Sequence, residues 1–155
     1  MTDRLNLLTL ARALPDVERP AYDRNAVSAG IVHLGIGAFH RAHQAVVIDD
    51  VLKTDPRWGI IGASLRRPDT KEALGPQDGL YTVFVKDGEL RRLRVIGSVL
   101  KLIDGRAERD ALLAAMTAPT TQIVSLTITE KGYGYSPAAG GPDVANQDIA
   151  ADLAA

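Results

Sequence analysis

Two glycines, Gly35 and Gly37, have the spacing of a phosphate-binding turn. They follow a short apolar run at residues 31–34 and precede residues 38–54, which contain neither proline nor glycine and favour a helix. Glycines permit a tight turn close to a pyrophosphate, and the start of a helix offers unpaired N–H groups. The pattern predicts dinucleotide binding. An ordinary strand-to-helix turn stays open as the alternative, because His40 replaces the third glycine of the G-x-G-x-x-G motif.

A second marker of dinucleotide binding is an acidic residue after the second strand, which holds the ribose hydroxyls. Asp69 follows the apolar residues 58–64, although it lies further from the glycines than the usual spacing of about 20 residues. Arg66 and Arg67 stand just before it, and an arginine there would accommodate the 2′-phosphate of NADP instead. These residues favour NAD and leave NADP open. Solvated charges at the start of a helix are the alternative interpretation.

Polar residues also follow the last apolar strand, at residues 127–133 (TITEKGY). Ligands of open α/β sheets bind beyond the carboxyl ends of the strands, so Thr129 is a candidate for the rim that faces the cofactor. Glu130 could serve as a proton-relay carboxylate, or it could simply be solvated. Nothing in the sequence places Lys131 in a desolvated pocket, so we do not assign it as a general base.

Three histidines raise the question of a metal site. His40 and His43 lie three residues apart and could share one face of a helix, where they would pack or contact the cofactor. A zinc site would need further ligands that converge with them, and only His33 remains in a chain without cysteine. We therefore expect no metal, and we expect His33 to be a core residue with a hydrogen-bonded ring.

Strands and helices alternate along the chain, and they must position these residues. Apolar runs predict strands, and proline-free or amphipathic runs predict helices. Strands are expected at 31–34, 58–64, 81–86, 90–99 and 123–129, and helices at 2–14, 38–54, 69–74 and 106–116. Asp87 and Gly88 favour a hairpin between the third and fourth strands. The fold class is therefore α/β, with a mostly parallel sheet, helices on both faces and an inserted antiparallel hairpin.

Composition limits the function classes. The chain has 155 residues, enough for one domain, and a net charge of −1, which provides no overall field for nucleic acid or an anionic membrane. It contains no cysteine, which excludes disulfides and fits a reducing compartment. Polar residues interrupt the amino-terminal segment, so a secretory signal is not expected, nor is a membrane span. We expect a cytoplasmic location, with a mitochondrial presequence as the alternative.

Four segments together resemble the polyol-specific long-chain dehydrogenases, the group of mannitol dehydrogenase and fructuronate reductase. They are residues 35–44 (GIGAFHRAHQ), 58–66 (WGIIGASLR), 77–81 (QDGLY) and 124–133 (VSLTITEKGY). The resemblance runs from about residue 5 to the carboxyl end. It implies a Rossmann-like fold, with residues 1–155 as an N-terminal dinucleotide-binding domain that is itself incomplete. It also implies NAD as the cofactor, with NADP left open, and chemistry that does not depend on zinc.

The resemblance also implies roles for individual residues. The expected cofactor-binding residues are Gly35, Ile36, Gly37, Ala38, Phe39, Arg66, Asp69 and Thr129. Pro68 stands where some family members carry a second acid, which weakens the expectation of NAD over NADP. Glu130 matches a glutamate at the active-site mouth that assists proton exchange, and it is the expected catalytic residue.

Family enzymes interconvert a sugar alcohol or aldonate and its ketose by hydride transfer with a nicotinamide cofactor. Their lysine general base lies in a later, mainly helical substrate domain, which is absent from these residues. The resemblance therefore implies the NAD-binding segment of such an oxidoreductase, inactive alone, with a small-molecule polyol or sugar-acid substrate. A separate chain carrying the substrate domain is a candidate partner. The alternative is a non-catalytic nucleotide-binding remnant or regulatory module.

Overall fold

A four-stranded parallel sheet forms the centre of the molecule in the computed structural model, which describes residues 4–128 and 134–154. Its strands are β2 (Ala29–Leu34), β3 (Gly59–Ser64), β6 (Val99–Asp104) and β7 (Ile123–Leu126). They lie in the order β6-β3-β2-β7, and each neighbouring pair is parallel. The central strands β2 and β3 are the short apolar runs of the sequence, as expected for strands that are buried on both faces.

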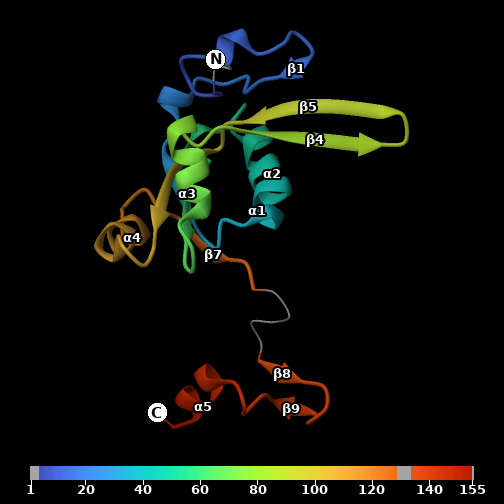
Figure 1. Cartoon of the computed structure of the whole chain (residues 1–155). Helices are drawn as coiled ribbons and strands as arrows, with labels where there is room; N and C mark the ends of the chain where they lie inside the picture. Colours follow the sequence, from blue (N-terminus) through green and yellow to red (C-terminus); the bar gives the residue numbers. More distant parts are fainter. Residues whose placement is uncertain (1–3, 129–133, 155) are drawn as a thin grey trace.

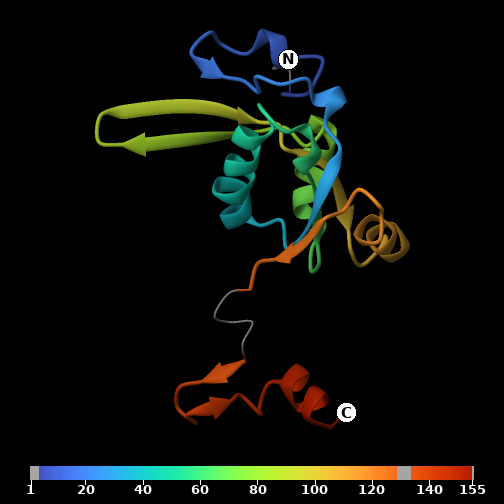
Figure 2. The same cartoon turned by 180° about the vertical axis from the view of Figure 1, so that it is seen from behind.

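Helices cover both faces of this sheet, as the sequence predicted. On one face, α1 (Ala38–Ala42), α2 (Gln44–Val51) and α3 (Asp69–Leu74) enclose a core that includes Ile31 and Ile60. On the other face, α4 (Arg109–Met116) encloses a smaller core around Val32 and Ile103. Figures 1 and 2 show α4 and α2 on opposite sides of the strands. Alternate residues of β2 therefore contribute to different cores.

Two expected helices have different bounds in the structure. The run 38–54 is divided between α1 and α2 at His43, whose backbone leaves the helical region at φ −126° and ψ −77°. The nitrogen Nδ1 of its ring lies 2.9 Å from the carbonyl oxygen of Phe39. The helix expected from residue 106 begins at Arg109, because Asp104 Oδ1 accepts from the backbone N–H groups of Arg106 and Ala107 and forms a turn first. The helix expected at 69–74 is confirmed as α3.

The predicted hairpin is formed by β4 (Tyr81–Asp87) and β5 (Leu90–Ile96). It joins the short strand β1 (Val17–Glu18) in a second sheet and reaches away from the main sheet in Figure 1. The predicted strand 90–99 was too long, because Gly97 and Ser98 separate β5 from β6. A Cβ at Gly97 would lie 2.8 Å from Pro20 Cγ, so the chain changes direction where no side chain fits.

The predicted amino-terminal helix is wrong over its described residues 4–14. The segment has only a short 3₁₀ turn at Leu10–Arg12. The side chain of Asn6 explains the difference, because its Oδ1 accepts hydrogen bonds from the backbone of Leu8 and Thr9. Such local bonds compete with a helical backbone. The other 3₁₀ turns are Arg24–Ala26, Pro56–Trp58 and Gly75–Gln77.

The carboxyl-terminal elements are β8 (Tyr135–Ser136), β9 (Gly141–Pro142) and α5 (Gln147–Ala154). The two strands form a small antiparallel pair, and Figure 1 shows this group apart from the main sheet. Within residues 4–128 and 134–154, no helix is long and apolar enough to cross a membrane.

Candidate functional site

The order in which the chain adds strands to the parallel sheet reverses between β2 and β7. From β2 the strands proceed through β3 to β6 on one side, and β7 then returns to the other side of β2. The connections that leave β2 and β7 therefore diverge at the carboxyl edge, and such a reversal point is where open α/β sheets bind ligands. Gly35 lies at this point, beside Thr127: a Cβ at Gly35 would be 3.7 Å from the carbonyl oxygen of Thr127. The structure thus places the predicted glycine turn at the expected edge of the sheet.

Backbone hydrogen bonds attach the glycine turn to β3. The N–H groups of Gly35 and Ile36 both donate to the carbonyl oxygen of Ala63, at 2.9 and 3.2 Å. Gly35 has φ +90°, a conformation that glycine adopts readily and other residues rarely do. The side chain of Ile36 is buried over Gly62, where an added Cβ would lie 2.7 Å from Ile36 Cδ1. Ile36 therefore belongs to the core, and a contact from it to a ligand is limited to its backbone.

The start of α1 is open to solvent. Gly37 precedes the helix and carries no side chain, and the next two residues, Ala38 and Phe39, are exposed. The first-turn N–H groups of a helix have no carbonyl partner within that helix and carry a partial positive charge. Phe39 is 59% exposed and stacks on His43, with ring centroids 4.6 Å apart. This arrangement can accept an anionic group against the backbone, with an aromatic side chain beside it.

The acidic candidate Asp69 is exposed and begins α3 at the same edge, after the end of β3 at Ser64. Arg66 is exposed on the connection between them. Arg41 links this region to the glycine turn, because its Nη1 donates to the carbonyl oxygen of Ile36 at 2.6 Å and lies 3.4 Å from Thr70 Oγ1. The structure therefore brings the turn and the start of α3 together, as a dinucleotide site requires.

Two predicted site residues, Thr129 and Glu130, lie outside the described residues. The strand that leads to them is described as far as Ile128. Along it, Ser125 and Thr127 lie on the same face of the sheet, since both hydroxyls contact the ring of His33.

His33 is the core histidine that the sequence predicted. It is fully buried, and its ring nitrogens lie 2.9 Å from Ser125 Oγ and 3.0 Å from Thr127 Oγ1. Burial, together with neighbouring His40, lowers the pKa of His33 from 6.5 to about 4, so the ring is neutral at physiological pH.

His40 and His43 do not share a face, which corrects the prediction from their spacing. His40 is 2% exposed and stacks on His33, with centroids 3.6 Å apart and planes 17° apart, whereas His43 is exposed. Burial lowers the pKa of His40 as well. The sequence did not indicate this stack, because it joins a strand residue to a helix residue across a turn.

Across the described ranges, no group of three His, Cys, Asp or Glu side chains is arranged to hold a metal ion.

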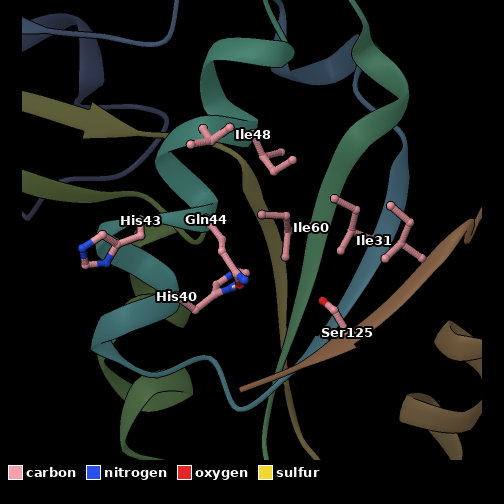
Figure 3. A pocket seen from close by; sticks show the side chains of 9 residues that line it. Ile31, His40, His43, Gln44, Ile48, Ile60 and Ser125 are labelled. Atoms are coloured by element: carbon pink, nitrogen blue, oxygen red, sulfur yellow. Dashed lines mark hydrogen bonds between the residues drawn. The ribbon is translucent and has the colours of Figure 1, made fainter. Parts of the chain in front are cut away.

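A pocket of about 370 Å³ lies beside His40, between the α1–α2 pair and the sheet. Figure 3 shows Ile31, Ile60 and Ser125 on the strands facing Gln44 and Ile48 on α2. Its lining is mostly aliphatic, so the pocket is suited to apolar groups rather than to phosphates. The anion-accepting features of the chain lie instead at the glycine turn.

Comparison with known proteins identifies the family. The family model described as "Mannitol dehydrogenase Rossmann domain" matches residues 29–154. The chain belongs to the mannitol dehydrogenase family. It is 46% identical over 142 residues to mannitol 2-dehydrogenase of Cereibacter sphaeroides, covering 89% of this chain and 30% of the relative. It is 42% identical over 142 residues to D-mannonate oxidoreductase of Escherichia coli (strain K12), covering 88% of this chain and 29% of the relative.

Two solved dehydrogenase structures share the fold. One is the Pseudomonas fluorescens mannitol 2-dehydrogenase in a ternary complex with NAD and D-mannitol, with a TM-score of 0.81 and 37% identity. Another is a D-sorbitol dehydrogenase in substrate-free form, with a TM-score of 0.81 and 32% identity. Each comparison covers 97% of this chain and 32% of the solved chain. The Rossmann-like fold expected from the resemblance is thereby confirmed, and the chain spans about a third of the length of these structures.

Proposed function

We propose that this chain binds NAD across the carboxyl edge of β2, β3 and β7. It forms the N-terminal dinucleotide-binding domain of an oxidoreductase that interconverts a sugar alcohol or aldonate and its ketose. The observation that carries the proposal is the position of the Gly35–Gly37 turn at the reversal point of the sheet, beside Thr127. The pyrophosphate lies against the start of α1, where backbone N–H groups and the helix dipole favour negative charge.

Asp69 and Arg66 bear on the choice between NAD and NADP. Asp69 is an exposed carboxylate at the start of α3, where it accepts hydrogen bonds from the ribose hydroxyls of NAD. A carboxylate at that position repels the additional phosphate of NADP, whereas Arg66 on the preceding connection attracts it. We assign NAD as the preferred cofactor on the basis of Asp69, and NADP as a weaker ligand.

The experiment that tests nucleotide binding uses Gly37→Asp. Gly37 has φ −75°, and a Cβ there would meet only the carbonyl oxygen of Gly35, at 3.7 Å, so the backbone accepts a side chain. Aspartate is a favourable residue before a helix, so the fold is retained. Its carboxylate repels the pyrophosphate, and NADH affinity measured by fluorescence titration falls at least about tenfold.

Gly37→Asn is the matched control, because asparagine has nearly the same size and also caps helices but carries no charge. It is expected to retain more affinity than Gly37→Asp. Equal NADH affinity in the two variants would remove the charge argument, and wild-type affinity in both would remove the glycine turn from the site.

In this proposal, the remainder of the enzyme binds the substrate and supplies the general base. The relatives are about three times as long as the region they share with this chain. In the family that the chain resembles, a lysine of the helical substrate domain accepts the proton of the alcohol. Glu130 would assist proton exchange, and a bound nicotinamide would supply the hydride acceptor. The matches to mannitol and mannonate dehydrogenases favour this assignment over a non-catalytic nucleotide-binding remnant.

A further inference from the structure

Two stacked imidazole rings lie directly beneath the proposed phosphate-binding turn. His33 belongs to β2 and His40 to the first turn of α1, and the Gly35–Gly37 turn connects these two elements. The ring centroids are 3.6 Å apart, and both side chains are at least 98% buried. The stack therefore joins the two ends of the turn through side chains as well as through the backbone.

Hydrogen bonds fix each ring on its other side. His33 contacts the hydroxyls of Ser125 and Thr127 on β7, and the Nδ1 atom of His40 lies 2.6 Å from Gln44 Oε1 on α2. A continuous line of contacts thus runs from β7 through both rings to α2, across the reversal point of the sheet. Thr127 also donates its backbone N–H to the carbonyl oxygen of Leu34, at 3.1 Å.

His40 is held by one ring nitrogen and by the flat face of its ring. Its Nε2 atom is buried and, among the described residues, has no hydrogen-bond partner. A phenylalanine would fill a similar volume and avoid the cost of burying an unpaired polar atom. Among the described residues, the ring makes two specific interactions. Its Nδ1 atom contacts Gln44, and its flat face stacks on His33.

We propose that His33 and His40 are positioning residues, which together hold the phosphate-binding turn and the exit of β7 in the one relative arrangement that accepts the dinucleotide. The inference rests on the proposed function for its ligand. Neither ring contacts the nucleotide. The stack acts on the backbone of the first turn of α1, whose N–H groups must point at the pyrophosphate, and on Thr127, which precedes the predicted cofactor rim.

The test compares two substitutions of His40 that differ in stacking. His40→Ala removes the ring, and His40→Phe keeps an aromatic face against His33. NADH affinity is expected to fall about tenfold in His40→Ala and to stay within about threefold of wild type in His40→Phe. In ¹H–¹⁵N spectra of the nucleotide-free chain, the amide signals of Gly35 and Gly37 shift in His40→Ala and return toward wild-type positions in His40→Phe.

A second variant and a control separate positioning from stability. Ser125→Ala removes one of the two hydrogen bonds to His33. It should shift the Gly35 and Gly37 amide signals too, and it can replace His40→Ala if that variant does not fold. Val47→Ala changes a side chain of α2 that is 61% exposed and has no part in the proposed site, and it should keep affinity within about twofold. Thermal unfolding measured on every variant shows whether affinity follows stability instead.

The outcomes distinguish this inference from the proposed function. Wild-type NADH affinity in His40→Ala, with unmoved Gly35 and Gly37 signals, overturns the positioning role and leaves nucleotide binding intact. Equal loss in His40→Phe and His40→Ala also overturns it, because stacking would then not matter. If the wild-type chain does not bind NADH, the proposed function fails, and the amide signals alone decide whether the pair holds the turn.

Discussion

Two neutral imidazoles, His33 and His40, stand out among the few polar side chains that the core buries. An unfolded histidine gains a proton near pH 6.5, whereas burial lowers the pKa of both rings in the folded chain. The groups facing them are the Ser125 and Thr127 hydroxyls, the Gln44 amide, and Arg41, whose positive charge further lowers the pKa of His40. The Gln44 contact to His40 and the Gly35 backbone beside His33 favour protonation, but burial outweighs both and lowers the two pKa values.

The lowered pKa values predict that the free energy of unfolding decreases as the pH is lowered. Below pH 6.5 the unfolded state binds protons that the folded state refuses until about pH 4, so the loss occurs between these values. For His33 the loss between about pH 7 and pH 5 is about 2 kcal/mol, and His40 adds to it in the same direction. Urea unfolding of His40→Phe at both pH values should show a smaller fall than the wild type. An identical fall in the two proteins would mean that His40 titrates normally in the folded chain.

At the scale of elements, a buried carboxylate holds the hairpin and the amino-terminal segment to the helical face of the sheet. Asp49 on α2 is 1% exposed and accepts from Tyr22 Oη at 2.5 Å, from the Gly97 N–H at 2.8 Å, and from Arg94 Nη2 at 2.7 Å. Burial and the hydrogen bond to Asp49 raise the pKa of Tyr22, so the phenol stays a donor. Three segments far apart in sequence thus meet at one side chain.

Asp49→Ala is expected to destabilise the chain by about 2–4 kcal/mol, because it leaves buried donors on Gly97, Tyr22 and Arg94 without their acceptor. Asp50→Ala is the matched control. Asp50 is the next residue on the same helix and also pairs with Arg94, but its side chain is 51% exposed, so its removal should cost less than about 1 kcal/mol. Urea unfolding measures both. A cost for Asp50→Ala as large as that for Asp49→Ala would show that burial does not set the strength of these contacts.

The sequence predicted the elements whose signals are local. Proline and glycine delimit α3, a glycine pair ends β2, and the apolar run of β3 has turn residues on either side. It also predicted that His33 would be buried with a hydrogen-bonded ring, since a lone histidine in an apolar strand must find partners.

The sequence did not predict features that depend on distant parts of the chain. Strand β6 was joined to the hairpin because the change of direction at Gly97 is imposed by Pro20 and by Asp49, which lie far away in sequence. The His33–His40 stack was not predicted for a similar reason. The spacing of His40 and His43 suggested a shared helix face, and the break at His43 sends the two rings to opposite environments.

At the scale of the whole molecule, the proposed nucleotide site lies at one end of the main sheet, and the hairpin lies at the other end. Figure 2 shows the β4–β5 hairpin and the amino-terminal segment at the end of the sheet opposite the exit of β7. The dinucleotide proposed for this edge would leave its nicotinamide near the β7 exit, since the glycine turn fixes the pyrophosphate next to it.

This division of roles predicts that NADH binding and turnover can be separated. The chain alone is expected to bind NADH and to produce none from NAD with D-mannitol or D-mannonate, because the proposed function assigns the general base to a substrate domain. Turnover should appear when the corresponding remainder of a family relative is produced together with it. NADH absorbance follows the reaction, and NADH fluorescence on the same preparation shows that the binding site has folded. Steady oxidation of either substrate by the chain alone, lost in Gly37→Asp, would place the general base within these 155 residues instead.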